Sequence, residues 1–292
     1  MKINGLSVVI PVYNEEKTLE KVVLAIKGVL DKEGVNYEII CVDDASRDKS
    51  YEILKKLKFV KTLKHPINKG YSTALKTGIK NSKYDWILIT DSDGTYPGDA
   101  IPSLLKYLPE YDMVVGARTG NEVNIPLFRK PAKFIIGKVA NYLSGYKIPD
   151  VNSGLRIFNK EIAMNFYHLY PQRFSFTITI TLAFLTNGYN VKYIPINYYK
   201  REEKSTIHPV KDFVKFITII MRIVSNFNPM KIFSLISFFL VFCALIIFLY
   251  SVLYLNAVKL DVTIIVLVLA AIQIFLFGII ADLIAKNNNR LK

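Results

Sequence analysis

The stretch WILITDSDGTYPGD, residues 86–99, places two aspartates directly after a short apolar run. Residues 86–90 predict a buried β-strand, because a short apolar run bounded by polar turn residues is typical of one. Asp91 and Asp93 then follow the strand, with one serine between them. Two interpretations are open: the carboxylates bind a metal ion and a phosphate, or they form a turn and cap the next helix.

On both sides of this stretch, strand patterns alternate with helix patterns. Strands are predicted over residues 6–12, 37–44, 59–63, 86–90 and 112–117, and helices over 16–30, 48–58, 71–81 and 100–108. Strands that alternate with helices of these lengths favour an α/β fold with a mostly parallel sheet and right-handed crossovers. The N-terminal two thirds of the chain therefore predict one α/β domain.

Polar residues stand at the carboxyl ends of four predicted strands, where ligands bind in sheets of this kind. These ends read Pro11-Val12-Tyr13-Asn14-Glu15, Asp43-Asp44-Ala45-Ser46, Asp91-Ser92-Asp93 and Gly116-Ala117-Arg118. Acidic groups that converge on one edge repel each other unless a cation or hydrogen-bond donors lie among them. One aspartate alone is equally well explained as an Asx turn or a helix cap, but four such strand ends together favour a site.

The sequence contains neither G-x-G-x-x-G after the first strand nor G-x-x-x-x-G-K-[ST]. A nucleotide bound here would therefore not have its phosphates held by a glycine-rich loop. A divalent cation on Asp91 or Asp93 is the expected substitute, and hard oxygen ligands favour Mg²⁺ or Mn²⁺.

The C-terminal part of the chain is strongly apolar. Of the 292 residues 51% are hydrophobic, and the mean hydropathy is +0.27. Residues 232–255 and 262–281 contain no charge, and each run is long enough to cross about 30 Å of hydrocarbon. They predict a hairpin of two transmembrane helices with residues 256–261 at its tip. Basic residues outside both runs, Lys231 before the first and Lys286, Arg290 and Lys292 after the second, place both termini in the cytoplasm.

We therefore expect a multi-pass protein of the cell membrane with its large domain on the cytoplasmic face. Residues 209–227 carry apolar residues at helical spacing and a basic polar stripe, which predicts an amphipathic helix lying in the lipid interface or packed on the domain. The expected organisation is a domain over 1–208, a juxtamembrane helix over 209–230, the two spans within 231–285, and a basic tail over 286–292.

Charge and cysteine content limit the partners. A formal net charge of +14 fits an anionic membrane surface, and no nucleic-acid-binding motif is present, so no nucleic-acid partner is expected. Cys41 lies in a predicted strand and Cys243 in a predicted span, so neither a disulfide nor a zinc site is expected. The three histidines share no spacing and are expected to be surface or packing residues.

Six motifs in order resemble those of the family 2 glycosyltransferases with the GT-A fold: VVIPVYNEE, VDDASRD, NKGYSTALKTG, DSDGTYP, VVGAR and DVNSGLRIF. Within that family they resemble the polyprenyl-phosphate glycosyltransferases most. The resemblance covers residues 5–210 and implies a Rossmann-like domain followed by the hairpin. It implies inverting sugar transfer from a UDP- or GDP-sugar to dolichyl or undecaprenyl phosphate, with Mg²⁺ or Mn²⁺ as cofactor. A homo-oligomer is possible.

The resemblance also implies roles for individual residues. The nucleotide is bound by Pro11, Tyr13, Asn14, Glu15, Asp43, Asp44, Asp91 and Ser92, and the metal by Asp91 and Asp93. The acceptor phosphate is bound by Arg118, Arg129 and Lys133, and the catalytic set is Asp93, Arg118, Arg129 and Arg201. In this set Arg201 belongs to a loop that closes over the donor phosphates. The resemblance further implies a helix over 175–189, although the alternating threonines there suggest a strand.

Some residues depart from the family pattern or keep two interpretations. Thr95 stands where related chains often have glutamine, Lys133 where they tend to have serine, and Lys204 where they have glycine. Thr206 stands where lysine is common. Asp150 is either a group near the acceptor or a turn residue.

Two other functions compete with transfer to a lipid phosphate. A processive polysaccharide synthase of the same fold carries Q-x-x-R-W, which is absent because Trp86 is the only tryptophan. A non-catalytic, glycosyltransferase-like membrane subunit would not need the intact pair Asp91 and Asp93. The sequence leaves the sugar and the nucleotide open.

Overall fold

The computed structural model describes residues 3–123, 134, 137–138, 140–142, 144–172, 175–200, 221, 229–254 and 262–290. The chain separates into two compact units, one holding the sheet and the other the C-terminal helices. The predicted amphipathic stretch 209–227, apart from Met221, and the predicted hairpin tip lie outside the described residues, whereas Pro229 and Met230 belong to the first C-terminal helix.

The first unit is built on a seven-stranded sheet with the order β3-β2-β1-β4-β6-β5-β7. Its strands are β1 (Leu6–Val12), β2 (Tyr37–Asp43), β3 (Val60–Lys64), β4 (Trp86–Ile89), β5 (Met113–Ala117), β6 (Arg156–Asn159) and β7 (Val191–Pro195). β1 pairs in parallel with β2 and β4, and β5 with β7, whereas β6 runs antiparallel between β4 and β5. The five predicted strands and the mostly parallel sheet are confirmed, whereas β6 and β7 had not been predicted.

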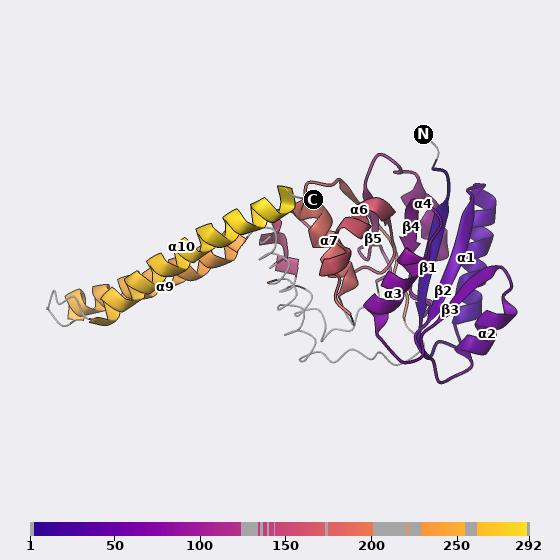
Figure 1. Ribbon diagram of the computed structural model, residues 1–292, viewed down its shortest axis with the longest axis horizontal. Helices are drawn as coiled ribbons and strands as arrows, with labels where there is room; N and C mark the ends of the chain where they lie inside the picture. Colours follow the sequence, from indigo (N-terminus) through magenta and orange to yellow (C-terminus); the bar gives the residue numbers. More distant parts are fainter. Residues whose placement is uncertain are drawn as a thin grey trace. The chain divides into compact units, whose positions relative to one another are not determined.

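Helices cover both faces of this sheet (Figure 1). They are α1 (Leu19–Glu33), α2 (Ser50–Lys56), α3 (Tyr71–Lys80), the 3₁₀ turn η1 (Gly98–Ala100), α4 (Ile101–Leu105), α6 (Lys160–Asn165), the 3₁₀ turn η3 (Tyr167–Leu169) and α7 (Phe176–Thr186). On one face, alternate residues of β1 pack with the apolar stripe of α1 and with α4 in one core cluster. On the other face, α3 contacts β1 and β2, and Gly78 lets it approach closely, since a Cβ there would lie 2.3 Å from Val9.

The helix expected over 175–189 from the family resemblance is present as α7, and its threonines explain the strand-like pattern. Thr179 and Thr181 donate hydrogen bonds to the carbonyls of Ser175 and Thr177, four residues earlier, at 2.9 and 2.7 Å. Residues 176–185 of the helix are all buried, so no polar face remains to mark a helical period.

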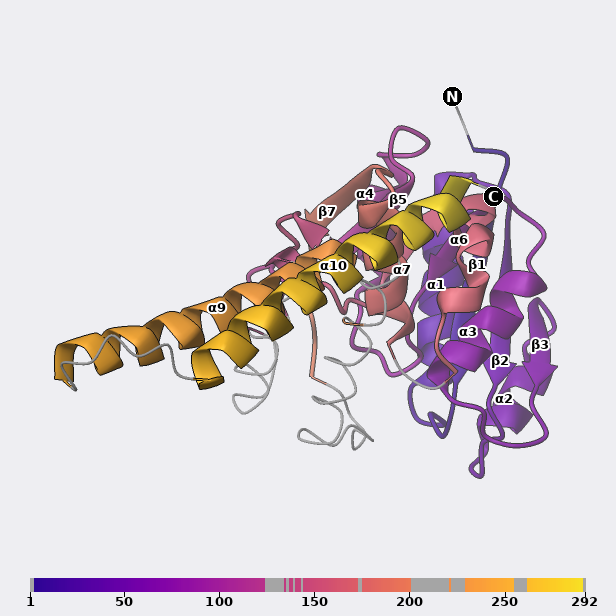
Figure 2. The same cartoon turned by 60° about the vertical axis from the view of Figure 1, so that its left-hand side comes forward.

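The second unit contains α9 (Pro229–Tyr254) and α10 (Val262–Arg290), which lie side by side as a hairpin in both views (Figures 1 and 2). Both helices are long and apolar enough to cross a membrane, which agrees with the two predicted spans. Small residues let them pack closely: a Cβ on Gly278 would lie 2.6 Å from the Cβ of Phe233. Ser237 donates a hydrogen bond of 2.8 Å to the Ala271 carbonyl across the pair.

Candidate active site

The carboxyl ends of β1 and β2 lie side by side, because Val12 pairs with Asp43 at the last position of each strand. Beyond this pair both chains turn through left-handed backbone, with φ of 56° at Asn14 and 60° at Ala45. The two turns are joined, since the side chain of Asn14 accepts a hydrogen bond of 2.8 Å from the Arg47 N–H. α1 therefore begins at Leu19, three residues later than predicted.

Asp43 is fully buried at this edge, and one of its two oxygens lacks a partner. Oδ1 accepts a hydrogen bond of 3.2 Å from the N–H of Ser46. Oδ2 is buried and has no hydrogen-bond partner among the described residues. A buried carboxylate oxygen without a donor is costly, so this atom is suited to accept a hydrogen bond from a bound ligand.

Asp44, the neighbouring acidic residue, points its oxygens into the protein. Its Oδ1 lies 2.7 Å from Nδ1 of His65 and accepts a hydrogen bond of 2.9 Å from the Lys69 N–H. Its Oδ2 accepts a hydrogen bond of 2.7 Å from the Gly70 N–H. Asp44 thus holds the turn before α3, and His65 is a packing residue, as expected.

The loop after β4 is fastened to the strand ends around it. Ser92 donates a hydrogen bond of 3.0 Å to the Pro11 carbonyl, and the Thr18 hydroxyl donates one of 2.8 Å to the Ser92 carbonyl. On the far side, the Tyr199 N–H donates to the Thr95 carbonyl at 2.9 Å. The loop is thereby held in one conformation next to β1.

Each carboxylate of this loop has its own side-chain donor. The hydroxyl of Tyr71, the first residue of α3, donates to Oδ1 of Asp91 at 2.8 Å. Burial, together with Asp91, holds the pKa of the Tyr71 phenol well above its ordinary value, so it is protonated at neutral pH. Oδ1 of Asp93 accepts from the Thr95 N–H at 3.1 Å and from the Thr95 hydroxyl at 2.7 Å. The turn interpretation therefore holds for one oxygen of Asp93, which forms an Asx turn.

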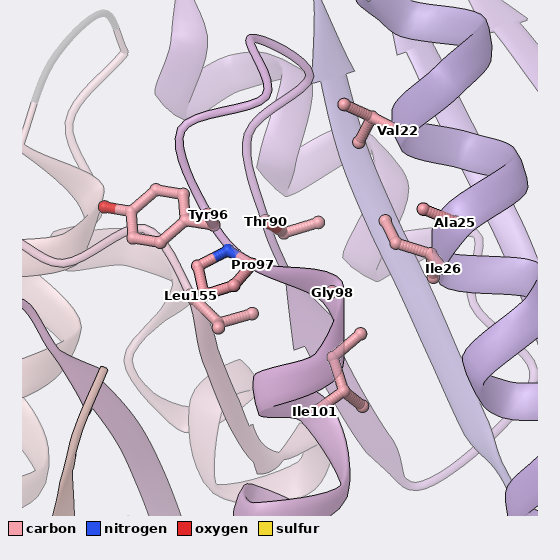
Figure 3. Close-up of a pocket in the computed structure, with 9 residues that line it drawn as sticks. All are labelled: Val22, Ala25, Ile26, Thr90, Tyr96, Pro97, Gly98, Ile101 and Leu155. Atoms are coloured by element: carbon pink, nitrogen blue, oxygen red, sulfur yellow. The ribbon is translucent and has the colours of Figure 1, made fainter. Parts of the chain in front are cut away.

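An apolar pocket lies beside this loop, between α1, α4 and the end of β4 (Figure 3). It is lined by Val22, Ala25, Ile26, Thr90, Tyr96, Pro97, Gly98, Ile101 and Leu155. The Tyr96 hydroxyl points away from α1 (Figure 3), and none of the described residues that line the pocket is charged. The pocket lacks the converging polar groups of a ligand site and is best described as a gap in the packing under the loop.

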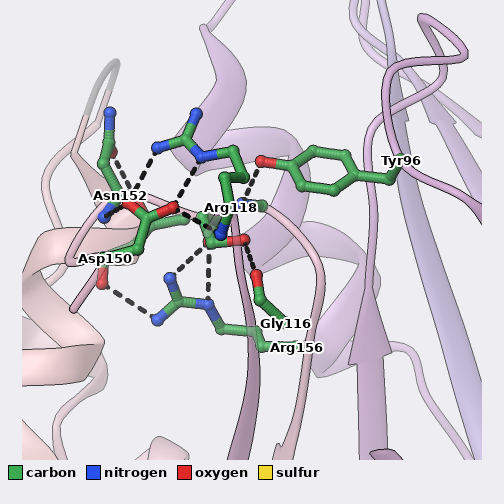
Figure 4. A network of polar contacts seen from close by, with 9 residues as sticks. Tyr96, Gly116, Arg118, Asp150, Asn152 and Arg156 are labelled. Carbon is green, nitrogen blue, oxygen red and sulfur yellow. Dashed lines mark hydrogen bonds and ion pairs between the residues drawn. The ribbon is translucent and has the colours of Figure 1, made fainter. Parts of the chain in front are cut away.

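Arg118, after β5, is paired with Asp150. Its Nε and Nη2 donate to the two carboxylate oxygens of Asp150 at 2.7 and 2.9 Å (Figure 4). Its guanidinium also lies 5.1 Å from the ring centre of Tyr198. Asp150 is fully buried, so the pair fixes the direction of Arg118. Two of the five guanidinium N–H donors are used on the carboxylate, so Arg118 could bind an anion with the others.

Arg156 lies below this pair and is fully buried (Figure 4). It donates to the carbonyls of Ser153 and Thr177 and to the hydroxyl of Thr181, and no ion pair among the described residues includes it. Arg156 thus joins the turn before β6 to α7 through neutral acceptors. Ser153 in turn donates a hydrogen bond of 2.5 Å to the Gly116 carbonyl.

The donor set at the end of β4 fits a divalent cation. Among the described residues no group of three or more histidine, cysteine or acidic side chains could hold a metal ion. The residues that could hold a metal ion here are Asp91 and Asp93, whose carboxylates each accept a hydrogen bond from a hydroxyl. This set suits Mg²⁺ or Mn²⁺, which commonly use one or two carboxylates and take their other oxygens from substrate phosphates and water.

The structure brings together the sequence-predicted residues of the strand ends: Pro11, Tyr13, Asn14, Glu15, Asp43, Asp44, Asp91, Ser92, Asp93 and Arg118. Arg129, Lys133, Arg201, Lys204 and Thr206 lie outside the described residues. Sequence reasoning missed the residues that orient these groups, chiefly Tyr71, Tyr96, Gly154 and Arg156. An arginine inside the apolar run LRIF was the one signal that could have marked Arg156 as a buried donor.

Comparison with known proteins agrees with this geometry. Residues 7–166 match glycosyl transferase family 2, and residues 228–286 match the GtrB C-terminal hairpin. A dolichyl-phosphate hexose transferase of Haloferax volcanii is 27% identical over 70% of this chain and 88% of its own length. A dolichol-phosphate mannosyltransferase of Pyrococcus furiosus is 33% identical over 46% of this chain, which spans 41% of that protein.

Among solved structures, the glucosyl-3-phosphoglycerate synthase of Mycobacterium tuberculosis in complex with Mn²⁺, UDP and glucosyl-3-phosphoglycerate has the same fold. It superposes with a TM-score of 0.61 at 16% identity, covering 76% of this chain and 80% of its own. The order of the motifs, the sheet topology and the family match over residues 7–166 lead to one conclusion: this chain is a member of glycosyl transferase family 2.

Proposed function

We propose that this glycosyltransferase transfers a sugar from a UDP- or GDP-sugar to a polyprenyl phosphate, with inversion at the anomeric carbon and a bound Mg²⁺ or Mn²⁺. The observation that carries the proposal is the shared edge of β1, β2 and β4. There Asp43 offers a buried oxygen with no partner among the described residues, and Asp91 and Asp93 follow β4 at the same edge. Relatives named for dolichyl-phosphate sugar transfer and the hairpin match support the lipid acceptor.

The donor nucleotide occupies the edge formed by β1 and β2. Asp43 accepts a hydrogen bond from the base or ribose through Oδ2, and the turn of Tyr13, Asn14 and Glu15 flanks it. Ser92, held against β1, lies under the diphosphate. When bound by Asp91 and Asp93, the divalent cation neutralises charge on the leaving diphosphate. The Mn²⁺ and UDP bound by the mycobacterial fold relative support this arrangement.

The acceptor needs cations more than it needs a base. A phosphomonoester has a second pKa near 6, so it is largely dianionic at pH 7 and no proton has to be removed from it. One of its oxygens forms the new bond to the anomeric carbon, while the bond to the diphosphate breaks and the nucleoside diphosphate leaves with the electron pair. Arg118, oriented by Asp150, and Arg129 with Lys133 supply the positive charge, and Arg201 supports the leaving diphosphate.

The hairpin of α9 and α10 anchors the domain at the cytoplasmic face of the cell membrane, where a polyprenyl phosphate exposes its headgroup. The length and apolar character of both helices support this placement, as do the basic residues outside them. The domain limits proposed are residues 1–208, 209–230, 231–285 and 286–292. A processive synthase is less well supported, because Q-x-x-R-W is absent.

The test is transfer of label to lipid by the purified full chain. We expect a labelled polyprenyl-phosphate sugar with at least one UDP- or GDP-linked donor in the presence of Mn²⁺ or Mg²⁺. Asp93→Ala should abolish it, whereas Asp99→Ala, which removes an exposed carboxylate six residues later, should not. No labelled lipid with any donor, or full activity in Asp93→Ala, would contradict the proposal.

A further inference from the structure

The motif NKGYSTALKTG supplies a residue that the proposed function has not used. Tyr71 is the first residue of α3, and its hydroxyl donates to Oδ1 of Asp91 at 2.8 Å. From another direction Gly154 approaches the same carboxylate, since a Cβ built on it would lie 2.9 Å from Oδ2 of Asp91. The Asp91 carboxylate therefore lies between the Tyr71 hydroxyl and the backbone of Gly154.

The position of Tyr71 is itself fixed by the end of another strand. Gly70, which precedes it, has φ of 93°, a conformation that residues with a side chain rarely adopt. Asp44, at the end of β2, accepts hydrogen bonds from the N–H groups of Lys69 and Gly70 at 2.9 and 2.7 Å. His65 lies between Asp44 and α3, with its Nε2 3.0 Å from the Thr77 hydroxyl.

A continuous line of contacts thus runs from Asp44 through the Gly70 turn and Tyr71 to Asp91. We propose that Tyr71 is a positioning residue that fixes the metal-binding carboxylate of Asp91, and that Asp44 acts by holding Tyr71 in place rather than by binding the nucleotide directly. This inference rests on the proposed function, because it assigns Asp91 to the metal. It explains why two adjacent aspartates, Asp43 and Asp44, follow β2: one oxygen of Asp43 is left for the ligand, and both oxygens of Asp44 are used on the protein.

Loss of the Tyr71 hydroxyl should weaken metal binding without changing the fold. Outer partners of metal ligands typically contribute about 10- to 100-fold to metal affinity or activity. Tyr71→Phe keeps the ring and removes only the donor, so we expect a Kd for Mn²⁺ about tenfold higher, at the lower end of that range. Asp44→Asn should change the Kd in the same direction, because an amide nitrogen cannot accept the Gly70 N–H.

The matched control is Tyr170→Phe. Tyr170 is also a buried tyrosine, and its hydroxyl donates to the Ala163 carbonyl at 2.8 Å, but this contact involves neither strand-end loop. The variant loses one hydrogen bond of the same kind. Its Mn²⁺ affinity should equal that of the wild type.

The experiment titrates the full chain with Mn²⁺ in the presence of UDP and, separately, of GDP, and measures free Mn²⁺ by electron paramagnetic resonance. We expect the tenfold weakening in Tyr71→Phe, no change in Tyr170→Phe, and no further weakening when Tyr71→Phe is added to Asp91→Asn. In activity assays the Mn²⁺ concentration for half-maximal rate should rise, with kcat at saturating Mn²⁺ near that of the wild type.

The outcomes separate this inference from the proposed function. If Tyr71→Phe binds Mn²⁺ as tightly as the wild type, only the positioning role is overturned. The same holds if Tyr71→Phe weakens Mn²⁺ binding by the same factor when Asp91 is already replaced by Asn. A wild-type chain that binds no Mn²⁺ with either nucleotide would overturn the metal-dependent proposal and this inference with it. If Asp44→Asn does not fold, the comparison of Tyr71→Phe with Tyr170→Phe still decides the role of Tyr71.

Discussion

The N–H of Gly154 donates a hydrogen bond of 2.6 Å to the hydroxyl of Tyr96, and this bond joins the loop after β4 to the turn before β6. The Tyr96 ring also meets Tyr198 edge to face, with 5.2 Å between the ring centres, and Tyr198 lies against Arg118. The side of the site that carries Asp91 and Asp93 is thereby held in register with the side that carries Arg118. A site built for transfer between two bound groups benefits from such preorganisation.

Tyr96→Phe should destabilise the domain, because it leaves the buried Gly154 N–H without an acceptor. A buried donor without a partner costs about 1–3 kcal/mol, which lowers the Tm of a domain of this size by about 2–12 °C. Fluorescence of Trp86 measures the transition, since the only tryptophan lies in β4 of the same sheet. Tyr142→Phe, at an exposed tyrosine, is the control; equal Tm values for the two variants would contradict a structural role for the hydrogen bond.

Asp43→Asn should weaken nucleotide binding without lowering the stability of the domain. The amide keeps an oxygen for the Ser46 N–H and removes a buried charge whose second oxygen has no partner among the described residues. We therefore expect an unchanged or higher Tm together with a nucleotide affinity at least about tenfold lower, a trade-off typical of functional sites. Calorimetric titration with UDP and GDP measures the affinity, and Asp99→Asn serves as the exposed control. A variant that binds nucleotide like the wild type would remove Asp43 from the nucleotide site.

Arg156→Met should strongly destabilise the domain, although methionine fits an apolar interior. It leaves the buried Ser153 carbonyl without its donor, at about 1–3 kcal/mol, and it removes one donor to the Thr177 carbonyl, which keeps the Thr181 hydroxyl. The Tm of Arg156→Lys should lie between those of the Met variant and the wild type, because one ammonium group cannot reproduce the planar set of guanidinium N–H donors. Arg47→Met, at an exposed arginine, controls for loss of charge in the same Tm measurement. A Tm of the Met variant equal to that of the wild type would show that the hydrogen bonds of Arg156 contribute little.

Thr95→Val should raise the Mn²⁺ concentration that gives half of the maximal rate. The Thr95 hydroxyl donates to Oδ1 of Asp93 at 2.7 Å, and valine keeps the shape while removing that donor. After chelation with EDTA, both chains should regain activity on addition of Mn²⁺. The variant should need about tenfold more for half its maximal rate.

The control for this experiment is Thr186→Val, whose hydroxyl donates to the Leu182 carbonyl at the end of α7. Its Mn²⁺ requirement should match that of the wild type. An unchanged requirement in Thr95→Val would mean that Asp93 needs no support from the hydroxyl. Thr95 would then be only a turn residue.

Strands and helices with strong apolar patterns were predictable from the sequence, whereas β6 and β7 were not. β6 is as short as β4, but an arginine opens it and an asparagine ends it, so only two apolar residues remain to mark a strand. β7 lies at the sheet edge and is only half buried, which weakens its alternation. The apolar runs of β1 and β4, by contrast, are continuous and fully buried.

For the site, the acidic groups were predictable but their partners were not. Asp91 and Asp93 stand at the end of a recognisable strand, so their place on the sheet edge follows from the α/β pattern. Tyr71 lies 20 residues before Asp91, and Asp150 lies 32 residues after Arg118. Contacts of this separation depend on how the loops fold back, which a local pattern does not contain.

The antiparallel course of β6 has a consequence for how this enzyme class changes its substrates. β5 and β6 are paired, with Val115 opposite Arg156, so the whole segment 118–155 leaves and re-enters the sheet at adjacent points. The entropy cost of closing a loop rises only slowly with its length, so a longer segment between these two strands adds little to that cost. The segment with Arg118, Arg129 and Lys133 can thus be exchanged or lengthened while the ladder of β1, β2 and β4 keeps every hydrogen bond. The topology thus separates a variable segment, in which we propose the acceptor phosphate site, from a fixed sheet edge, at which we propose the donor site.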